Sequence, residues 1–226
     1  FGVVDNSALV RIFDLAAPPG AQPLVLRRSN PEVAPFLNGC AFDATGRWLA
    51  TANVGDSALW PVGEACSMVL RGHWGRVTDL AFTPDGGHLV SVGGDSLRLW
   101  PLSGAIDAES RVLLENPGGF PGVDIDPSGA RAVTSAGGRV LVVPLKPGPI
   151  RSLEGFSGKV QISAVAFGDG GRLVAAVPFT SPRAEKLVRV WDLESGEVRT
   201  FGPTPGAGEG FKGGVDAIAF AGREAL

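Results

Sequence analysis

The chain has 226 residues, of which 44% are hydrophobic and 19% charged, so it is long enough to bury a substantial core. Its formal net charge of −3 supplies no basic field for a phosphate backbone, which argues against nucleic acid as the main partner. The 33 glycines and 18 prolines favour many short strands and tight turns over disorder, because apolar runs recur between the turn residues.

A unit of about forty residues recurs along the chain, which is a typical length for a four-stranded repeat. In chain order, we expect residues 1–15 to supply the third and fourth strands of one unit. Four complete units follow, at about residues 33–62, 74–102, 119–145 and 156–193. Residues 211–226 then supply the first and second strands of a last unit. The protein is therefore expected to be all-β.

Two markers of the same period support this division. One is a bulky residue at the end of the third strand: Phe13, Trp60, Trp100, Val143 and Trp191. The other closes the first strand: Phe42, Phe82, Ile125, Phe167 and Phe220. Turns such as residues 83–86 (Thr-Pro-Asp-Gly) separate the strands, because proline presets φ and glycine accepts a positive φ. The strands are apolar on both faces, so we expect each sheet to be covered by a neighbour on either side.

The best-preserved unit carries a Gly72-His73 pair, then Ser91, Asp95 and a closing Trp100. This pattern resembles the WD40 repeat family. The resemblance implies a β-propeller, in which each unit is one blade. It also implies that His73, Ser91, Asp95 and Trp100 form a structural tetrad of hydrogen bonds that links the loop before a blade to its third strand.

Other copies depart from the family pattern. The closing Trp-Asp pair is literal only at Trp191-Asp192, and it becomes Trp60-Pro61 and Trp100-Pro101 in two other copies. Phe156 and Phe211 stand where an alignment places His73. We expect those two copies to fill the same space with an aromatic ring.

The partial units at the two ends leave two architectures open. Strands from both ends of the chain could complete one blade and close a five-bladed ring, which would remove exposed sheet edges. Alternatively, the chain is a cut segment of a larger propeller, most often seven-bladed in this family. We favour the segment, because Phe1 is not a translation start and Leu226 falls within a predicted strand.

The sequence does not favour a catalytic site or a metal site. His73, Ser91 and Asp95 could form a hydrolase-like trio, but the structural tetrad explains the same three residues, and a Gly-x-Ser-x-Gly turn is absent from the sequence. Two histidines and two cysteines make a metal site improbable, and we expect Cys40 to be a small buried hydrophobe. The glycine-rich residues 202–214 lack the Gly-Lys-Ser/Thr ending of a phosphate-binding loop, so no cofactor is expected.

Membrane association is not expected either. The longest apolar runs fall short of the ~18 residues that cross a bilayer. A signal-peptide pattern is not visible at the start of the sequence, and we expect a cytoplasmic protein.

Aromatic and arginine residues near one end of the expected propeller are the best candidates for partner contact, since such side chains commonly anchor protein interfaces. They are Phe36, Trp74, Arg76, Phe120 and Phe211, together with Arg183 in an insertion at residues 179–186. We therefore expect a non-enzymatic scaffold that binds a protein or peptide. An alternative is a sensor or regulatory domain of a larger signalling protein such as a bacterial kinase, and a third is a propeller hydrolase or lyase.

Overall fold

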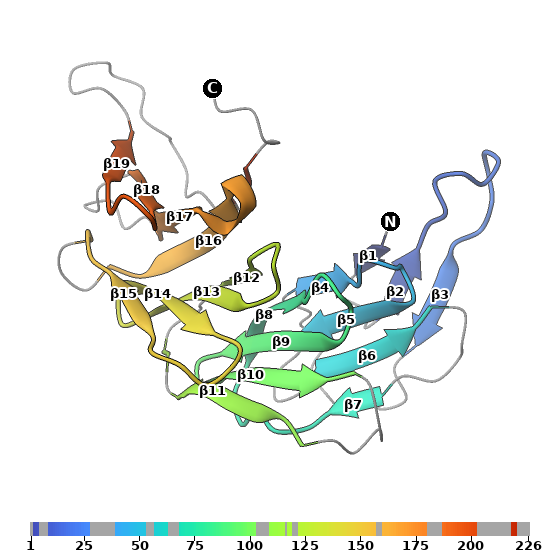
Figure 1. The fold of residues 1–226 in the computed structure, drawn as a ribbon. Coiled ribbons are helices and arrows are strands. Elements are labelled where there is room, and N and C mark those ends of the chain that lie inside the picture. Colours follow the sequence, from blue (N-terminus) through green and yellow to red (C-terminus); the bar gives the residue numbers. More distant parts are fainter. Residues whose placement is uncertain are drawn as a thin grey trace.

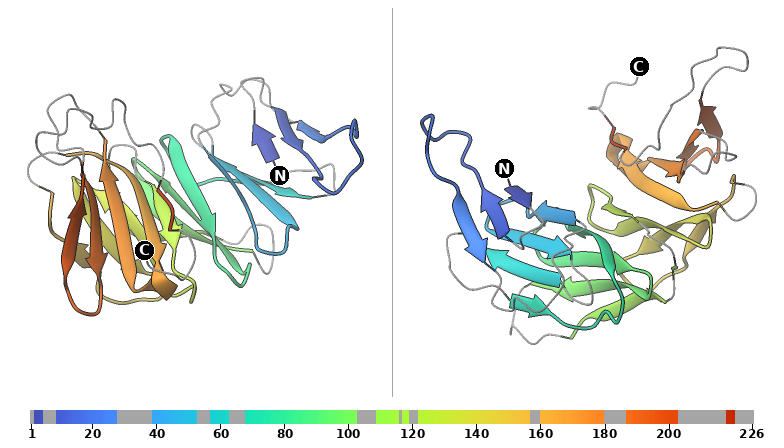
Figure 2. Two further views of the ribbon diagram at one scale, coloured as in Figure 1. Left: turned by 90° about the horizontal axis from the view of Figure 1, so that it is seen from above. Right: turned by 180° about the vertical axis from the view of Figure 1, so that it is seen from behind.

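The computed structural model describes residues 2–4, 9–27, 39–52, 57–62, 68–102, 109–115, 117–118, 122–156, 160–179, 187–202 and 218–220. Within these residues the fold consists of antiparallel sheets that follow one another in chain order along an arc (Figure 1). The sheet of β1–β3 lies at one end of the arc and the sheet of β16–β19 at the other, as the view from behind also shows (Figure 2).

The described strands form five sheets, which we number as blades 1 to 5 in chain order. Blade 1 contains β1 (Gly2–Val4), β2 (Leu9–Ile12) and β3 (Leu24–Arg27). Blade 2 contains β4 (Gly39–Phe42), β5 (Trp48–Ala52), β6 (Ser57–Pro61) and β7 (Met68–Leu70). Blade 3 contains β8 (Val77–Phe82), β9 (His88–Gly93), β10 (Ser96–Pro101) and β11 (Arg111–Glu115). Blade 4 contains β12 (Val123–Ile125), β13 (Arg131–Ala136), β14 (Arg139–Pro144) and β15 (Arg151–Leu153). Blade 5 contains β16 (Ile162–Gly168), β17 (Leu173–Pro178), β18 (Val188–Asp192) and β19 (Val198–Phe201), with a 3-10 turn, η1, at Asp169–Gly171.

Each blade is a meander in which every strand pairs with the next along the chain. The first strands of consecutive four-stranded blades contact one another, β4 with β8, β8 with β12 and β12 with β16. The first strand therefore marks the inner edge of the arc and the fourth strand its outer rim. This arrangement confirms the prediction of an all-β protein built from propeller blades.

The tight turn between β8 and β9 illustrates how the sequence sets the meander. Gly86 adopts a φ of 66°, which is the left-handed conformation that glycine accepts without strain. Its amide donates to the Thr83 carbonyl at 2.8 Å, while the Thr83 amide donates to the His88 carbonyl at 3.0 Å. The turn residues thereby bring β9 back alongside β8.

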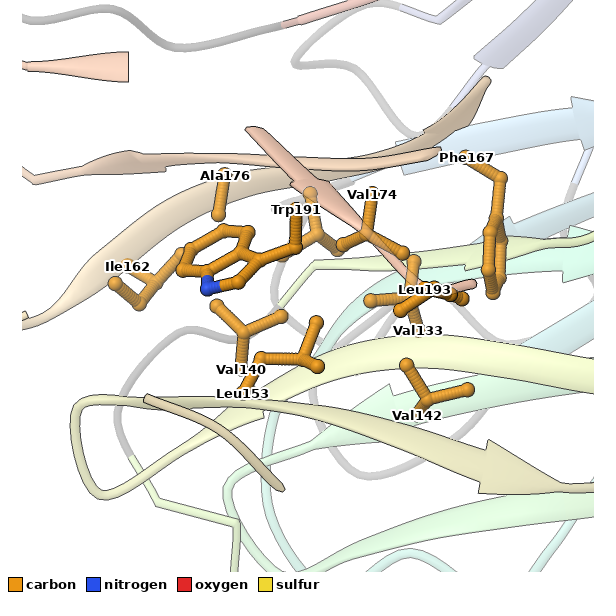
Figure 3. Packing of buried hydrophobic residues seen from close by; sticks show 11 residues of the cluster. Val133, Val140, Val142, Leu153, Ile162, Phe167, Val174, Ala176, Trp191 and Leu193 are labelled. Atoms are coloured by element: carbon orange, nitrogen blue, oxygen red, sulfur yellow. The ribbon is translucent and has the colours of Figure 1, made fainter. Parts of the chain in front are cut away.

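The hydrophobic core lies between the blades. Strand alternation sends Leu89 of β9 toward blade 2, whereas its neighbour Val90 packs toward blade 4. Between blades 4 and 5, Val133 and Val140 meet Trp191 in a cluster of buried side chains (Figure 3). Both faces of a central blade are thus buried, which is why its strands are almost continuously apolar.

The structure corrects the strand assignment at the N-terminus, where residues 1–15 were expected to form the third and fourth strands of a blade. In blades 2, 3 and 5 the marker tryptophan lies in the third strand, so β2, which ends beside Phe13, is a third strand. Consequently β1 is a second strand, and the fourth strand is β3, which lies beyond residue 15. Of the expected half blade at 211–226, the structure describes only residues 218–220.

Cys40 is exposed, so the prediction of a buried cysteine is wrong. The side chain at the matching position of blade 3 is Leu80, which is buried against blade 2. A first strand of blade 1, which would cover Cys40 in the same way, is not found among the described residues. In the part of the chain that the structure describes, no helix has the length and apolar character needed to cross a membrane.

Candidate functional site

The structure brings His73, Ser91, Asp95 and Trp100 together in blade 3. His73 lies in the loop between β7 and β8, Ser91 on β9, Asp95 in the turn after β9, and Trp100 on β10. Nδ1 of His73 is 2.9 Å from Oδ1 of Asp95, and its Nε2 is 2.7 Å from Oγ of Ser91. The indole Nε1 of Trp100 donates to the same serine oxygen at 2.8 Å. A loop, a turn and two strands are therefore joined by one chain of hydrogen bonds.

The chemistry of the four side chains fixes the direction of this chain. An indole N–H can only donate, so the Ser91 oxygen accepts from Trp100 and its hydroxyl proton goes to Nε2 of His73. The remaining ring proton of His73, on Nδ1, is donated to the Asp95 carboxylate. Every donor then has an acceptor, which is the condition for burying polar groups without penalty.

Burial and charge act in opposite directions on the two ionisable members. Burial lowers the pKa of His73 below its ordinary value, and the hydrogen bond and charge of Asp95 offset only part of that effect. For Asp95, partial burial acts to raise the pKa, but hydrogen bonds from His73 and Ser96 outweigh it and the pKa is lowered. The pair therefore consists of a neutral imidazole and a carboxylate at neutral pH.

Comparison with known proteins gives the same family as the geometry. Residues 64–101, which contain all four residues of the tetrad, match the family described as WD domain, G-beta repeat. The chain is also 35% identical over 103 residues to an uncharacterized WD repeat-containing protein of Synechocystis sp. (strain ATCC 27184 / PCC 6803 / Kazusa). Residues 64–101 therefore form a WD40 repeat. The match to the Synechocystis protein covers 44% of this chain and 29% of the relative. The chain therefore spans less than a third of the relative's length.

WD40 repeats generally mediate contacts between proteins, and proteins made of them are generally scaffolds without enzymatic activity. The geometry of blade 3 agrees with a supporting role for its serine. Ser91 has no exposed surface, and its hydroxyl is engaged by both His73 and Trp100. A substrate would have to displace the tetrad before it could reach this oxygen.

In blades 2 and 5 the indole N–H of the marker tryptophan has a different acceptor. In blade 2, Trp60 Nε1 donates at 3.1 Å to the hydroxyl of Thr51, which stands where Ser91 stands in blade 3. In blade 5, Trp191 Nε1 donates to the main-chain carbonyl of Glu154 at 2.8 Å. Thr51 is not among the predicted site residues. Aligning the second strands of blades 2 and 3 places it at the position of Ser91, and this alignment could have identified it.

The tetrad of this WD40 blade also fixes the loop that carries Trp74 and Arg76. The Trp74 amide donates to Oδ2 of Asp95 at 3.4 Å, while its side chain is 89% exposed. Gly93 lies so close to this loop that an added Cβ would stand 2.6 Å from the Arg76 carbonyl oxygen. The loop therefore packs directly on the end of β9, with the Trp74 ring turned toward solvent and the Arg76 residue exposed.

The remaining predicted contact residues, Phe36, Phe120, Arg183 and Phe211, lie outside the described residues. Phe179, the first residue of the expected insertion, is 58% exposed at the end of β17. Because β16 pairs with β17 antiparallel, Phe179 lies beside the start of β16, at the end of its blade that corresponds to Trp74 in blade 3. Among the described residues, His, Cys, Asp and Glu side chains form no group of three or more that could hold a metal ion.

Two half-buried aspartates link the inner strands of neighbouring blades. Asp79 on β8 accepts from the Val123 amide of blade 4 at 3.0 Å, and Asp124 on β12 accepts from the Phe167 amide of blade 5 at 2.7 Å. Burial raises the pKa of Asp79 to about 6, although hydrogen bonds from Val123 and Leu80 act against it and the charge of Asp124 adds to it. Burial likewise raises the pKa of Asp124.

Proposed function

We propose that this chain is a non-enzymatic docking module, which binds a peptide segment of a partner protein at the end of the blades that carries Trp74. The observation that carries this proposal is the exposure of 89% of the Trp74 side chain on a loop fixed by the tetrad. Indole rings are among the commonest energetic anchors of protein interfaces. A ring with this much exposed surface is available to pack against a partner.

Rigidity of the surrounding loops supports the same role. The Gly118 amide donates to the Gly94 carbonyl at 3.2 Å, and the Gly137 amide donates to the Pro117 carbonyl at 3.2 Å. These bonds join the turns of blades 3 and 4 at the Trp74 end into one connected surface. A surface that is already ordered loses little conformational entropy when a partner binds.

Arg76 extends the proposed site beyond a single ring. It is exposed and lies two residues after Trp74 in the same loop. A guanidinium carries five N–H donors, so it can bind carboxylates or main-chain carbonyls of a peptide laid across the indole. The expected partner segment therefore presents an apolar side chain to Trp74 and an acceptor to Arg76.

The test is partner recovery by the intact chain and by two variants, Trp74→Ala and Arg76→Ala, in pull-downs quantified by mass spectrometry. Ile150→Ala is the matched control, because Ile150 is an exposed apolar residue (42%) in the segment that leads into β15. We expect the two variants to lose the partners that the control retains, with thermal stability unchanged to within ~0.5 kcal/mol for Trp74→Ala. Equal recovery by all four proteins would remove Trp74 and Arg76 from the site.

A second candidate is a regulatory module inside a longer chain, whose binding partner is another segment of the same protein. It is supported by the relative from Synechocystis, most of whose length lies outside the matched region. The two candidates differ in one measurable respect. A regulatory module would bind a flanking segment of its own chain, and Trp74→Ala would release that segment to proteolysis.

A further inference from the structure

A second surface with the character of a binding site lies at the opposite end of the blades. It is a groove of about 770 Å³ between blades 3 and 4, bordered by the turns that join first and second strands. Thr83 and Ser128 mark these turns on its two sides. Its volume falls in the range of ordinary ligand sites. It shares no residue with the loop of Trp74 and Arg76.

The floor of this groove is apolar because prolines replace the aspartate of the family's Trp-Asp pair. Pro101 and Pro144 follow the marker positions of blades 3 and 4 and line the groove with Leu99 and Pro147. In blade 5 the same position is Asp192, whose carboxylate accepts from the Glu194 and Ser195 amides at 2.9 and 3.1 Å. The prolines are thus a departure from the family pattern, which blade 2 shares at Pro61 and blade 5 does not.

The matching groove between blades 4 and 5 shows what the prolines change. It is smaller, about 460 Å³, and is lined mainly by charged residues and glycines, among them Arg151, Asp169 and Arg172. Arg172 in this groove is paired, with Asp169 at 2.7 Å and with Asp192 at 3.6 Å. The groove between blades 4 and 5 therefore presents paired charges where the groove between blades 3 and 4 presents prolines. The position between two blades does not by itself give an apolar floor.

Charges of opposite sign stand on the two walls of the larger groove. Asp85 and Glu109 on blade 3 outnumber Arg111, whose guanidinium is bound to the Leu145 carbonyl. On blade 4, Lys146 stands beside Arg131, which is paired with Asp126. The Lys146 and Glu109 side chains are exposed, and neither makes a hydrogen bond or ion pair with any described residue. Hydrogen bonds from Thr83 and Gly87 hold the pKa of Asp85 below its ordinary value, so this wall carries negative charge at neutral pH.

A hydrogen bond joins the two walls across the blades. The guanidinium of Arg111, from blade 3, donates to the Leu145 carbonyl of blade 4. Within blade 4, the Leu145 amide donates to the Ala130 carbonyl at 2.9 Å. The groove is therefore formed before any ligand arrives, and little reorganisation opposes binding.

We propose that this groove binds a short extended peptide in which an apolar residue is flanked by one acidic and one basic residue. The apolar side chain packs on Pro101 and Pro144, the acidic residue pairs with Lys146, and the basic residue pairs with Asp85 and Glu109. Charge complementarity selects this occupant, since a wholly acidic or wholly basic segment would meet one repulsive wall. The site is independent of the docking face at Trp74 and could be occupied together with it.

The probe is a displayed library of random heptapeptides, selected on the intact chain and then measured against purified variants. Lys146→Glu reverses one wall, and Arg139→Glu is the charge-matched control at the Trp74 end of blade 4. We expect Lys146→Glu to weaken the selected peptides at least about tenfold and Arg139→Glu and Trp74→Ala to leave them unchanged. A new selection on Lys146→Glu should replace the acidic residue of the peptide by lysine or arginine.

A second variant tests the groove without changing its charge. Ala130 is exposed on the lining, and Ala130→Phe would place a ring in the space assigned to the apolar side chain. Loss of binding in this variant, with the same thermal unfolding midpoint as the parent, supports the proposal. Failure to enrich any peptide, or enrichment only of peptides that ignore both Lys146→Glu and Ala130→Phe, would overturn it. A selection in which every enriched peptide is lost on Trp74→Ala and on neither groove variant would support the docking face instead.

Discussion

The rings of Phe156 and Trp191 lie edge to face, with their centroids 5.8 Å apart. Phe156 thereby takes the place beside the blade 5 tryptophan that His73 takes beside Trp100 in blade 3, where the centroids are 6.3 Å apart. The indole N–H of Trp191 donates to the Glu154 carbonyl, because Ala176, which has no hydroxyl, stands where Ser91 stands in blade 3. A blade of this chain can thus hold its preceding loop either by a polar tetrad or by aromatic packing with one main-chain bond.

This equivalence predicts that a phenylalanine should replace His73 at lower cost than alanine does. His73→Ala would leave a cavity and two polar partners without their bonds, and it should lower the free energy of unfolding by about 2–4 kcal/mol. His73→Phe keeps a ring against Trp100 and should cost about half as much. Urea denaturation of both variants measures this, and an alanine variant within ~0.5 kcal/mol of the parent would contradict a supporting role for the tetrad.

The buried imidazole also predicts a pH dependence. Burial lowers the pKa of His73 in the folded state, whereas the unfolded chain has a histidine pKa near ~6.5. Below that value the unfolded state binds more protons than the folded state, so stability should fall as the pH decreases from 7 toward the folded pKa. The difference in unfolding free energy between the parent and His73→Phe should therefore shrink between pH 7 and pH 5. A difference that stays constant over this range would show that His73 does not titrate differently on folding.

The repeat and its two markers were sufficient to predict the blades, because Trp60, Trp100 and Trp191 occupy equivalent buried positions between sheets. The fourth strands were not located from the sequence. All four residues of β19 are exposed, and β15 has only three residues, of which two are exposed, so neither strand shows the apolar run that identifies the inner strands. Strands at the rim are held mainly by main-chain pairing, which leaves little signal in the side chains.

The two proposed binding surfaces also differ in whether they could be predicted from the sequence. Trp74 and Arg76 could be predicted as exposed because they follow His73 in a loop whose ends the repeat defines. The groove between blades 3 and 4 could not, since Pro101 and Pro144 belong to different repeats and meet only when the blades stack. Spacing in the sequence identifies residues that share a blade but says little about what two blades enclose.

Asp79 should make a contribution to the pH dependence that is opposite in sign to that of His73. Its folded pKa of about 6 exceeds the unfolded value near ~3.9, so between these values the folded state holds a proton that the unfolded state has released. Stability from this group is present below pH ~4 and is lost as the pH rises through about 6, by roughly 2–3 kcal/mol in total.

Asp79→Asn removes the ionisable group and retains one carbonyl oxygen for the link to blade 4. The measurement is the unfolding free energy of parent and variant at pH 4, 5, 6 and 7. The parent should lose about 2–3 kcal/mol relative to the variant across this series, because only the parent ionises a half-buried carboxyl. Parallel curves would mean that the carboxyl is solvated in the folded state. Glu115→Gln serves as the control, since Glu115 is exposed at the end of β11.

A hydrogen bond from Arg151 joins blade 4 to blade 5 near the outer rim. Its guanidinium donates to the Leu193 carbonyl of blade 5 at 2.6 Å, as Arg111 donates to the Leu145 carbonyl one blade earlier. Arg151→Ala should lower the free energy of unfolding by about 1 kcal/mol, because a charged donor is lost from a bond that is partly exposed to water. Hydrogen exchange should show the loss locally, at the Leu193 amide that bonds to the Arg172 carbonyl at 2.9 Å. The control is Arg139→Ala, which changes an exposed arginine at the other end of the same blade and should leave the Leu193 amide as protected as in the parent. Equal exchange of this amide in both variants would show that the Arg151 contact does not join the blades.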